Sequence, residues 1–87
     1  MSRNQKTLKQ ILAGSQNIRF EDFIALLIGF GFILKRVNGS HHVFGHPKIQ
    51  RPFPVQPLQN KAKIYQAHQL LRLVEQYDLH LDDEDAE

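Results

Sequence analysis

The chain contains no cysteine and no long apolar run. Without cysteine it cannot form disulfides, thiolate zinc sites or a cysteine nucleophile, so the fold must depend on a packed apolar core. The opening residues, MSRNQKTLKQ, lack the apolar stretch of a secretory signal, and no segment approaches the roughly 20 apolar residues of a membrane span. We therefore expect a soluble protein of the reducing cytoplasm.

Acidic residues are scarce in most of the chain. Residues 1–77 carry all eleven lysines and arginines but only three acids, a net charge of +8, whereas residues 78–87 carry the other six acids. A strongly basic body favours a polyanionic partner such as RNA, DNA or an acidic protein surface, although solubility alone also accounts for it. The dense acids predict that residues 82–87 form a disordered tail.

The length of 87 residues suits one small domain, which we place at residues 1–81. Residues 1–17 are expected to be an N-terminal extension around a short helix over 5–13. A domain of this size is too small for a deep, enclosed pocket, so we expect a shallow surface site and no cofactor.

Two further helices are predicted from apolar residues at helical spacing. In residues 17–30, one stripe predicts a helix that lies on a core and stops at Gly31. This stripe consists of Phe20, Phe23, Ile24, Leu27 and Ile28. A second stripe runs to Tyr77, and Asn60 is placed as its N-cap.

Between these helices the sequence predicts three strands. Residues 32–37 and 41–47 are rich in strand formers, and the Asn38-Gly39 step between them indicates a hairpin turn in which Gly39 supplies a positive φ. Residues 49–58 contain three prolines and fit only a sheet edge. The order α-α-β-β-β-α predicts an α+β fold in which a three-stranded antiparallel sheet packs helices on one face.

Three of the five histidines fall in the segment RVNGSHHVFGHPK, residues 36–48. In a strand, His41 and His42 point to opposite faces, while His42 and His46 share a face about 13 Å apart. Zinc needs its ligand nitrogens about 2 Å from the ion, so we expect no metal site. One histidine of the pair can serve as an acid or base, since histidine titrates near physiological pH. Alternatively, one packs in the core and the other is a solvated strand residue.

The segment GSHHVFGHP, residues 39–47, resembles the second-strand signature of the HicA toxin family, the mRNA interferases of bacterial toxin–antitoxin systems. Upstream, FEDFIALLIGFGF (20–32) is similar to that family's first core helix. Downstream, KAKIYQAHQLLRLVEQYDL (61–79) is similar to its closing helix. The resemblance covers roughly residues 18 to 81.

The resemblance implies a fold like the double-stranded RNA-binding domain, a ribonuclease that blocks translation, and inhibition by a HicB-like antitoxin. The family's catalytic histidine maps onto His41, and His42 is the adjacent, more variable position. Many members carry Val-Pro-Val-His in the third strand, where this chain has FPVQ (53–56). A single-histidine site is therefore implied.

If RNA is the substrate, cleavage needs no metal: a base removes the 2′-OH proton, the oxygen attacks phosphorus, and cations stabilise the phosphoryl charge. His41 is our candidate for the base, or for the acid at the leaving oxygen. Lys35 and Arg36 can stabilise the charge or can form an ordinary solvated strand face. Ser40 in the turn, and Lys61 and Lys63 in the expected first turn of the last helix, are the other candidate RNA-binding residues.

Two other functions fit the same sequence. A non-catalytic RNA- or DNA-binding module would use the basic residues and leave His41 incidental. An adaptor for an acidic protein would use the histidine-rich strand as a pairing edge. Salt-sensitive RNA binding distinguishes the ribonuclease and the nucleic-acid-binding module from the adaptor, because the affinity of phosphate contacts falls steeply as the salt concentration rises.

Overall fold

Three helices and one antiparallel sheet make up residues 2–81, the part of the chain that the computed structural model describes. In chain order the elements are α1 (Arg3–Leu12), α2 (Phe20–Gly29), β1 (Ile33–Asn38), β2 (His41–His46), β3 (Ile49–Val55) and α3 (Ile64–Tyr77). The strand order is β1-β2-β3, so both connections are hairpins. The predicted α+β fold, similar to a double-stranded RNA-binding domain, is confirmed; the expected acidic tail lies outside the described residues.

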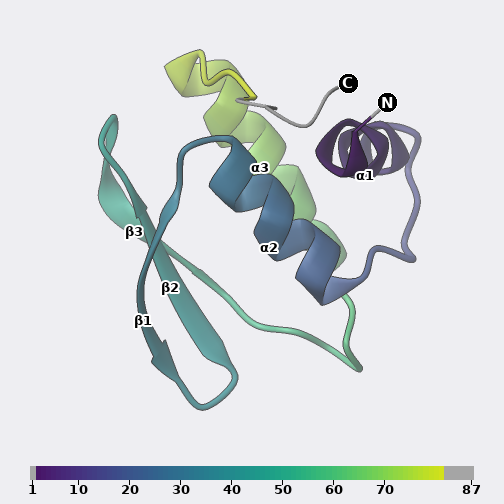
Figure 1. Cartoon of the computed structure of the whole chain (residues 1–87), viewed down its shortest axis with the longest axis horizontal. Coiled ribbons are helices and arrows are strands. Elements are labelled where there is room, and N and C mark those ends of the chain that lie inside the picture. Colours follow the sequence, from purple (N-terminus) through teal and green to yellow (C-terminus); the bar gives the residue numbers. More distant parts are fainter. Residues whose placement is uncertain (1, 82–87) are drawn as a thin grey trace.

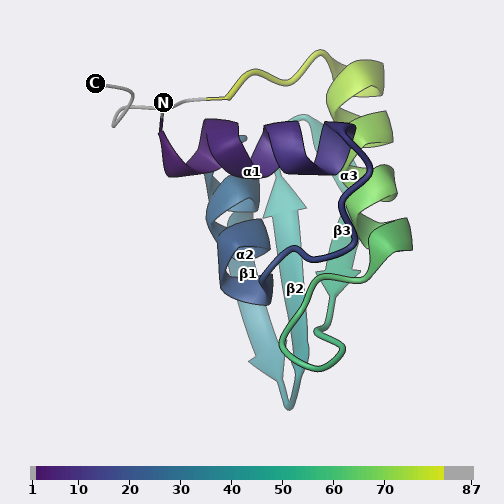
Figure 2. The same cartoon turned by 90° about the vertical axis from the view of Figure 1, so that its right-hand side faces the viewer.

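The elements form three layers. Helices α2 and α3 lie side by side against one face of the sheet, and α1 lies on the side of these helices that is remote from the sheet (Figure 1). Turned by 90°, the molecule has α1 running across α2 and α3 (Figure 2). No described helix covers the second face of the sheet, which we call the outer face.

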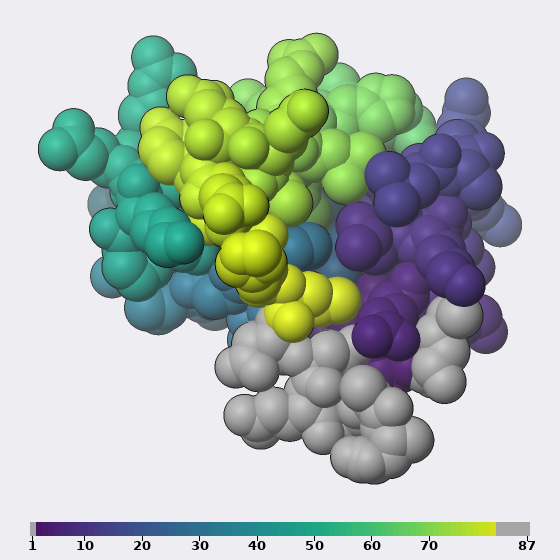
Figure 3. Space-filling view, turned by 90° about the horizontal axis from the view of Figure 1, so that it is seen from above, coloured from purple at the N-terminus to yellow at the C-terminus, as the bar shows by residue number. Residues whose placement is uncertain are grey.

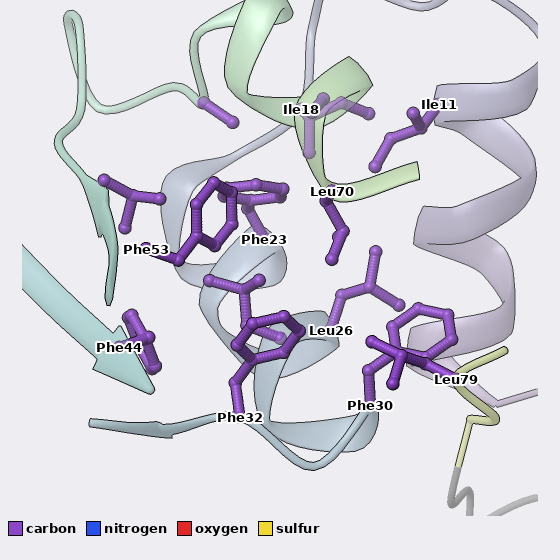
Figure 4. Close-up of a cluster of buried hydrophobic side chains, with 14 of the residues drawn as sticks. Ile11, Ile18, Phe23, Leu26, Phe30, Phe32, Phe44, Phe53, Leu70 and Leu79 are labelled. Atoms are coloured by element: carbon purple, nitrogen blue, oxygen red, sulfur yellow. The ribbon is translucent and has the colours of Figure 1, made fainter. Parts of the chain in front are cut away.

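The core lies between the sheet and the α2–α3 layer, as the close-up in Figure 4 shows. Phe44 of β2 has no exposed surface, and Leu70 brings α3 onto the same cluster. The α2 stripe is confirmed in part: Phe23 and Leu27 are fully buried, but Ile28 is 56% exposed. Leu26 takes the core position instead, which a rotation of the helix by a fraction of a turn explains.

Helix α1 is tied to α2 at its N-terminal end. Its start lies two residues before the predicted one, because the Ser2 side chain accepts a hydrogen bond from the backbone N–H of Gln5 and caps the helix. Arg3 forms an ion pair with Asp22 of α2 at 2.8 Å. In the view from above, the chain beyond α3 runs from that helix toward α1 (Figure 3).

The predicted N-cap at Asn60 is wrong, because α3 begins at Ile64. Gln59 and Asn60 instead have φ of 53° and 66° and form a tight turn in which Leu58 and Lys61 exchange backbone hydrogen bonds. Asparagine tolerates the left-handed conformation that this turn requires. The backbone of the turn also pairs with the segment that enters α2, because the Phe20 N–H donates a hydrogen bond to the Asn60 carbonyl.

We predict that Gly31→Ala destabilises the fold more than Gly14→Ala. Both glycines have positive φ, 97° and 87°, so each substitution adds a backbone cost of about 1–2 kcal/mol. A Cβ on Gly31 would also lie 3.0 Å from Nε2 of His46, whereas nothing lies within 4 Å at Gly14. Chemical denaturation measures both free energies of unfolding, and equal losses would contradict the predicted contact with His46.

Candidate functional site

The side chains of β2 alternate between the two faces of the sheet. Phe44 is buried on the helix layer, and the His42 ring meets the edge of Phe20 with ring centroids 5.2 Å apart. Side chains on a strand alternate, so His41 points to the outer face, where it is exposed. The two adjacent histidines therefore serve different surfaces.

Both ring nitrogens of His46 form hydrogen bonds with the backbone. Its Nε2 lies 2.9 Å from the Phe30 carbonyl oxygen, and its Nδ1 accepts a hydrogen bond from the Lys48 N–H at 3.1 Å. A carbonyl can only accept, so Nε2 carries the proton. The ring also packs edge-on to Phe32, at a centroid distance of 4.9 Å. His46 thus joins β2 to the end of α2 and to the following turn as part of the scaffold.

His41 begins β2 directly after the tight turn of the β1–β2 hairpin. That turn places Gly39 at φ 63° and Ser40 at its centre, and pairs Asn38 with His41. None of the described residues makes a hydrogen bond or ion pair with the His41 ring, so both nitrogens are open to a ligand. The β2–β3 register ends at the His42–Val55 pair, and Gln56, the residue after β3, donates its backbone N–H to the side-chain oxygen of Gln66 in α3.

A bulge in β1 places both predicted cations of this strand, Lys35 and Arg36, on the outer face. Leu34 pairs with Phe44 and Arg36 with Val43, so Lys35 is an extra residue in β1. Two residues of a bulged strand oppose one residue of its partner, which lets Lys35 and Arg36 share the outer face instead of alternating. The Lys35 chain lies over Gly45, where an added Cβ would come 2.9 Å from its Cε.

Arg36 is the diagonal cross-strand neighbour of His41. Its partner Val43 is two residues along β2 from His41, and diagonal neighbours in a sheet lie on the order of 7–8 Å apart. A guanidinium at that distance can reach a phosphate bound beside the imidazole. The sequence contains no Asp or Glu between residues 23 and 74, so the strands bring no carboxylate to this face.

Lys61 and Lys63 do not lie in the first turn of α3, contrary to the prediction. Lys61 belongs to the bridge that pairs the β3–α3 loop with Arg19, and Lys63 is the residue before the helix. Neither lysine lies on β2, which carries His41, or on β1, which carries Lys35 and Arg36. Helix α3 begins later than predicted because the turn at residues 59–60 and the bridge at Lys61 occupy residues that the prediction assigned to the helix.

A groove of about 800 Å³ is the feature that sequence reasoning missed. Phe20 and Ile24 from α2, Leu34 from β1, His42 from β2 and Pro57 from the following loop line it, and Lys61 also contributes. These residues are distant in the sequence, and no motif marks them. The groove opens on the helix side of the sheet, away from His41.

Within residues 2–81, no three histidine or acidic side chains come together as a metal-binding group. His41 and His42 lie on opposite faces, and His46 has both ring nitrogens occupied. The described part of the chain also contains no helix with the length and apolarity needed to cross a membrane.

Fold and charge together define a small, basic α+β protein built like a double-stranded RNA-binding domain, with a cationic sheet face that no described helix covers. A family model described as "HicA toxin of bacterial toxin-antitoxin" matches residues 20–75, from the start of α2 to near the end of α3. This match covers more than half of the chain, and the chain belongs to the HicA toxin family. Comparisons with curated proteins and with solved structures give no match.

We predict that His46→Ala and His41→Ala have different effects on stability. The first variant removes two hydrogen bonds and leaves the Phe30 carbonyl without its partner, a loss of about 2 kcal/mol. The second removes an exposed ring and should change the free energy of unfolding by less than about 0.5 kcal/mol. Urea denaturation of both variants measures the difference; a large loss in His41→Ala would show that this ring is structural.

Proposed function

We propose that the protein is the toxin of a HicAB-type pair, a metal-independent endoribonuclease that cleaves mRNA in the cytoplasm and so inhibits translation. The family match supports the toxin assignment. The observation that carries the chemistry is the placement of His41: an exposed imidazole on a sheet face with Lys35 and Arg36 and without carboxylates. Histidine is then the natural proton acceptor available on that face.

His41 acts as general base on the ribose 2′-OH that precedes the scissile phosphate. The resulting oxygen attacks phosphorus in line, the bond from phosphorus to the 5′ oxygen breaks, and a 2′,3′-cyclic phosphate forms. A solvent molecule protonates the departing 5′ oxygen, since Gln56, which follows Val55 of β3, cannot donate a proton as an imidazolium does. Base catalysis alone contributes about 10²–10⁴-fold, so we expect a slow nuclease.

Arg36 binds the phosphate and stabilises the negative charge that gathers on its free oxygens, and Lys35 adds positive charge farther along the same face. The guanidinium of Arg36 can engage two oxygens at once, whereas Lys35 acts as a point charge. The bulge places both side chains on the outer face, but the Lys35 chain lies over Gly45, four residues along β2 from His41, so we assign Lys35 to a neighbouring phosphate of the RNA. Ser40, in the turn beside His41, is positioned to contact the RNA backbone.

Membership of the family implies a cognate antitoxin, and we propose a HicB-like protein that covers the outer face. A partner with acidic residues would complement Lys35 and Arg36 and exclude RNA from His41. Surface electrostatics of this kind also accelerates association.

We predict that induction of the wild type in a bacterial host without antitoxin stops growth and fragments mRNA, and that His41→Ala does neither. Loss of the base should lower the cleavage rate by about 10²–10⁴-fold. His68→Ala, which removes an exposed histidine from α3, is the matched control and should remain toxic. Circular dichroism checks that each variant folds, and a folded, toxic His41→Ala chain would refute the assignment.

A non-catalytic RNA- or DNA-binding module is the second candidate, and one observation favours it. No described residue orients the His41 ring, whereas catalytic bases are commonly held by a third group. If wild type and His41→Ala both leave mRNA intact and bind RNA with equal, salt-sensitive affinity, the protein binds without cutting.

We predict that Gln56→His increases the cleavage rate by about tenfold to 10²-fold. An imidazole at this position, next to the residue that pairs with His42, could protonate the 5′ oxygen that water otherwise serves. Gln56→Asn, which keeps an amide, is the control and should not increase the rate. Single-turnover cleavage of a labelled RNA measures both variants, and an unchanged rate in Gln56→His would contradict the proposed geometry.

A further inference from the structure

The groove beside Phe20 has the composition of a site for a flat, partly apolar ring. Its walls are the side chains of Phe20, Ile24, Leu34 and Pro57. Leu34 remains 43% exposed although it belongs to the face of β1 that is turned toward the helices. Ligand sites are typically apolar hollows with a few converging polar groups, and a volume of about 800 Å³ is ample for one nucleotide.

His42 supplies an oriented polar group at the wall of this groove. Its Nδ1 lies 3.1 Å from the Ser40 carbonyl oxygen, and since a carbonyl only accepts, Nδ1 carries the proton. In its neutral form, this tautomer presents the lone pair of Nε2, to which no described residue donates. The edge contact with Phe20, at an interplanar angle of 68°, fixes the plane of the ring. An exocyclic amino group of a base is a suitable donor to that nitrogen.

The rim of the groove carries positive charge that is not fully compensated. Arg19 pairs with Glu21 at 3.5 Å, and both line the groove. Lys61, whose backbone pairs with that of Arg19, forms no ion pair among residues 2–81. An apolar hollow with one free cation at its edge fits a nucleotide, whose base is flat and whose phosphate is negative.

We propose that this groove binds a base of single-stranded RNA, from a nucleotide neighbouring the cleaved one, with its phosphate at Lys61. The proposal rests on the proposed ribonuclease function and adds a specificity site to it. His41 and His42 are consecutive, so the groove and the cleavage face meet at the hairpin turn. A strand that passes round this turn places one phosphate at His41 and a nearby base against Phe20 and His42. Stacking on aromatic side chains is a general means of holding unpaired bases.

A hexanucleotide with a 2′-O-methyl group on every ribose and all four bases represented tests the proposal by fluorescence anisotropy at fixed salt. This probe cannot be cleaved by 2′-OH attack, so the result does not depend on catalysis. We expect Leu34→Ser to weaken binding about tenfold. Ile33→Ser is the matched control: Ile33 is adjacent in β1, is 51% exposed and pairs with Gly45 on the outer face, so it should change affinity less than about twofold.

The lysines offer a second matched pair. Lys61→Gln and Lys63→Gln remove the same charge two residues apart, but Lys63 does not line the groove. The proposal requires the larger loss of affinity in Lys61→Gln. Equal losses would indicate a diffuse electrostatic effect and would overturn the phosphate assignment.

An abasic version of the hexanucleotide separates base from backbone. The wild type should bind the abasic probe about as weakly as the Leu34→Ser variant binds the complete probe. For the abasic probe, the Leu34→Ser substitution should cause no further loss of affinity. If Leu34→Ser leaves binding of the complete probe unchanged, or weakens both probes alike, the groove is not a base site, and an antitoxin segment becomes the better occupant. Failure of the proposed function would be observed in a different experiment, as RNA cleavage that persists in the His41→Ala variant.

Discussion

The complete burial of Phe44 under the α2–α3 layer is the constraint on which the rest of the site depends. A strand alternates its side chains, so fixing one residue fixes the face of every neighbour, and a slip of one residue would invert them all. With Phe44 inward, His42 and His46 must face the helices and His41 must face outward. The hydrophobic core therefore decides which histidine is presented to a large ligand.

The three histidines of one short strand consequently have different surroundings. His46 is bonded at both nitrogens and connects β2 to the end of α2. His42 is bonded at one nitrogen and presents the other to a groove. His41 makes no hydrogen bond with any residue that the structure describes, and Arg36 is its diagonal neighbour. Lys35 reaches that same face only because β1 contains a bulge, so a local irregularity of the sheet completes the cationic surface.

The sequence predicted the features that depend on local chemistry. Apolar spacing located α2 and α3, and the strand-forming residues around Gly39 located the hairpin that sets His41 beside the turn. The start of α3 was wrong because asparagine suits both an N-cap and a left-handed turn, and backbone pairing with the segment entering α2 accompanies the turn. The bulge at Lys35 and the groove at Phe20 depend on register and on contacts between distant segments, so neither has a local sequence signal.

The end groups of RNA cleaved by the purified protein in excess EDTA test the account most directly. Attack by a 2′-OH under the action of His41 predicts cleavage without metal and fragments that end in a 2′,3′-cyclic phosphate and begin with a 5′-hydroxyl. A nuclease that activates water through a metal ion leaves different ends. Fragments with a 3′-hydroxyl and a 5′-phosphate, or cleavage that stops in EDTA, would contradict the proposed mechanism.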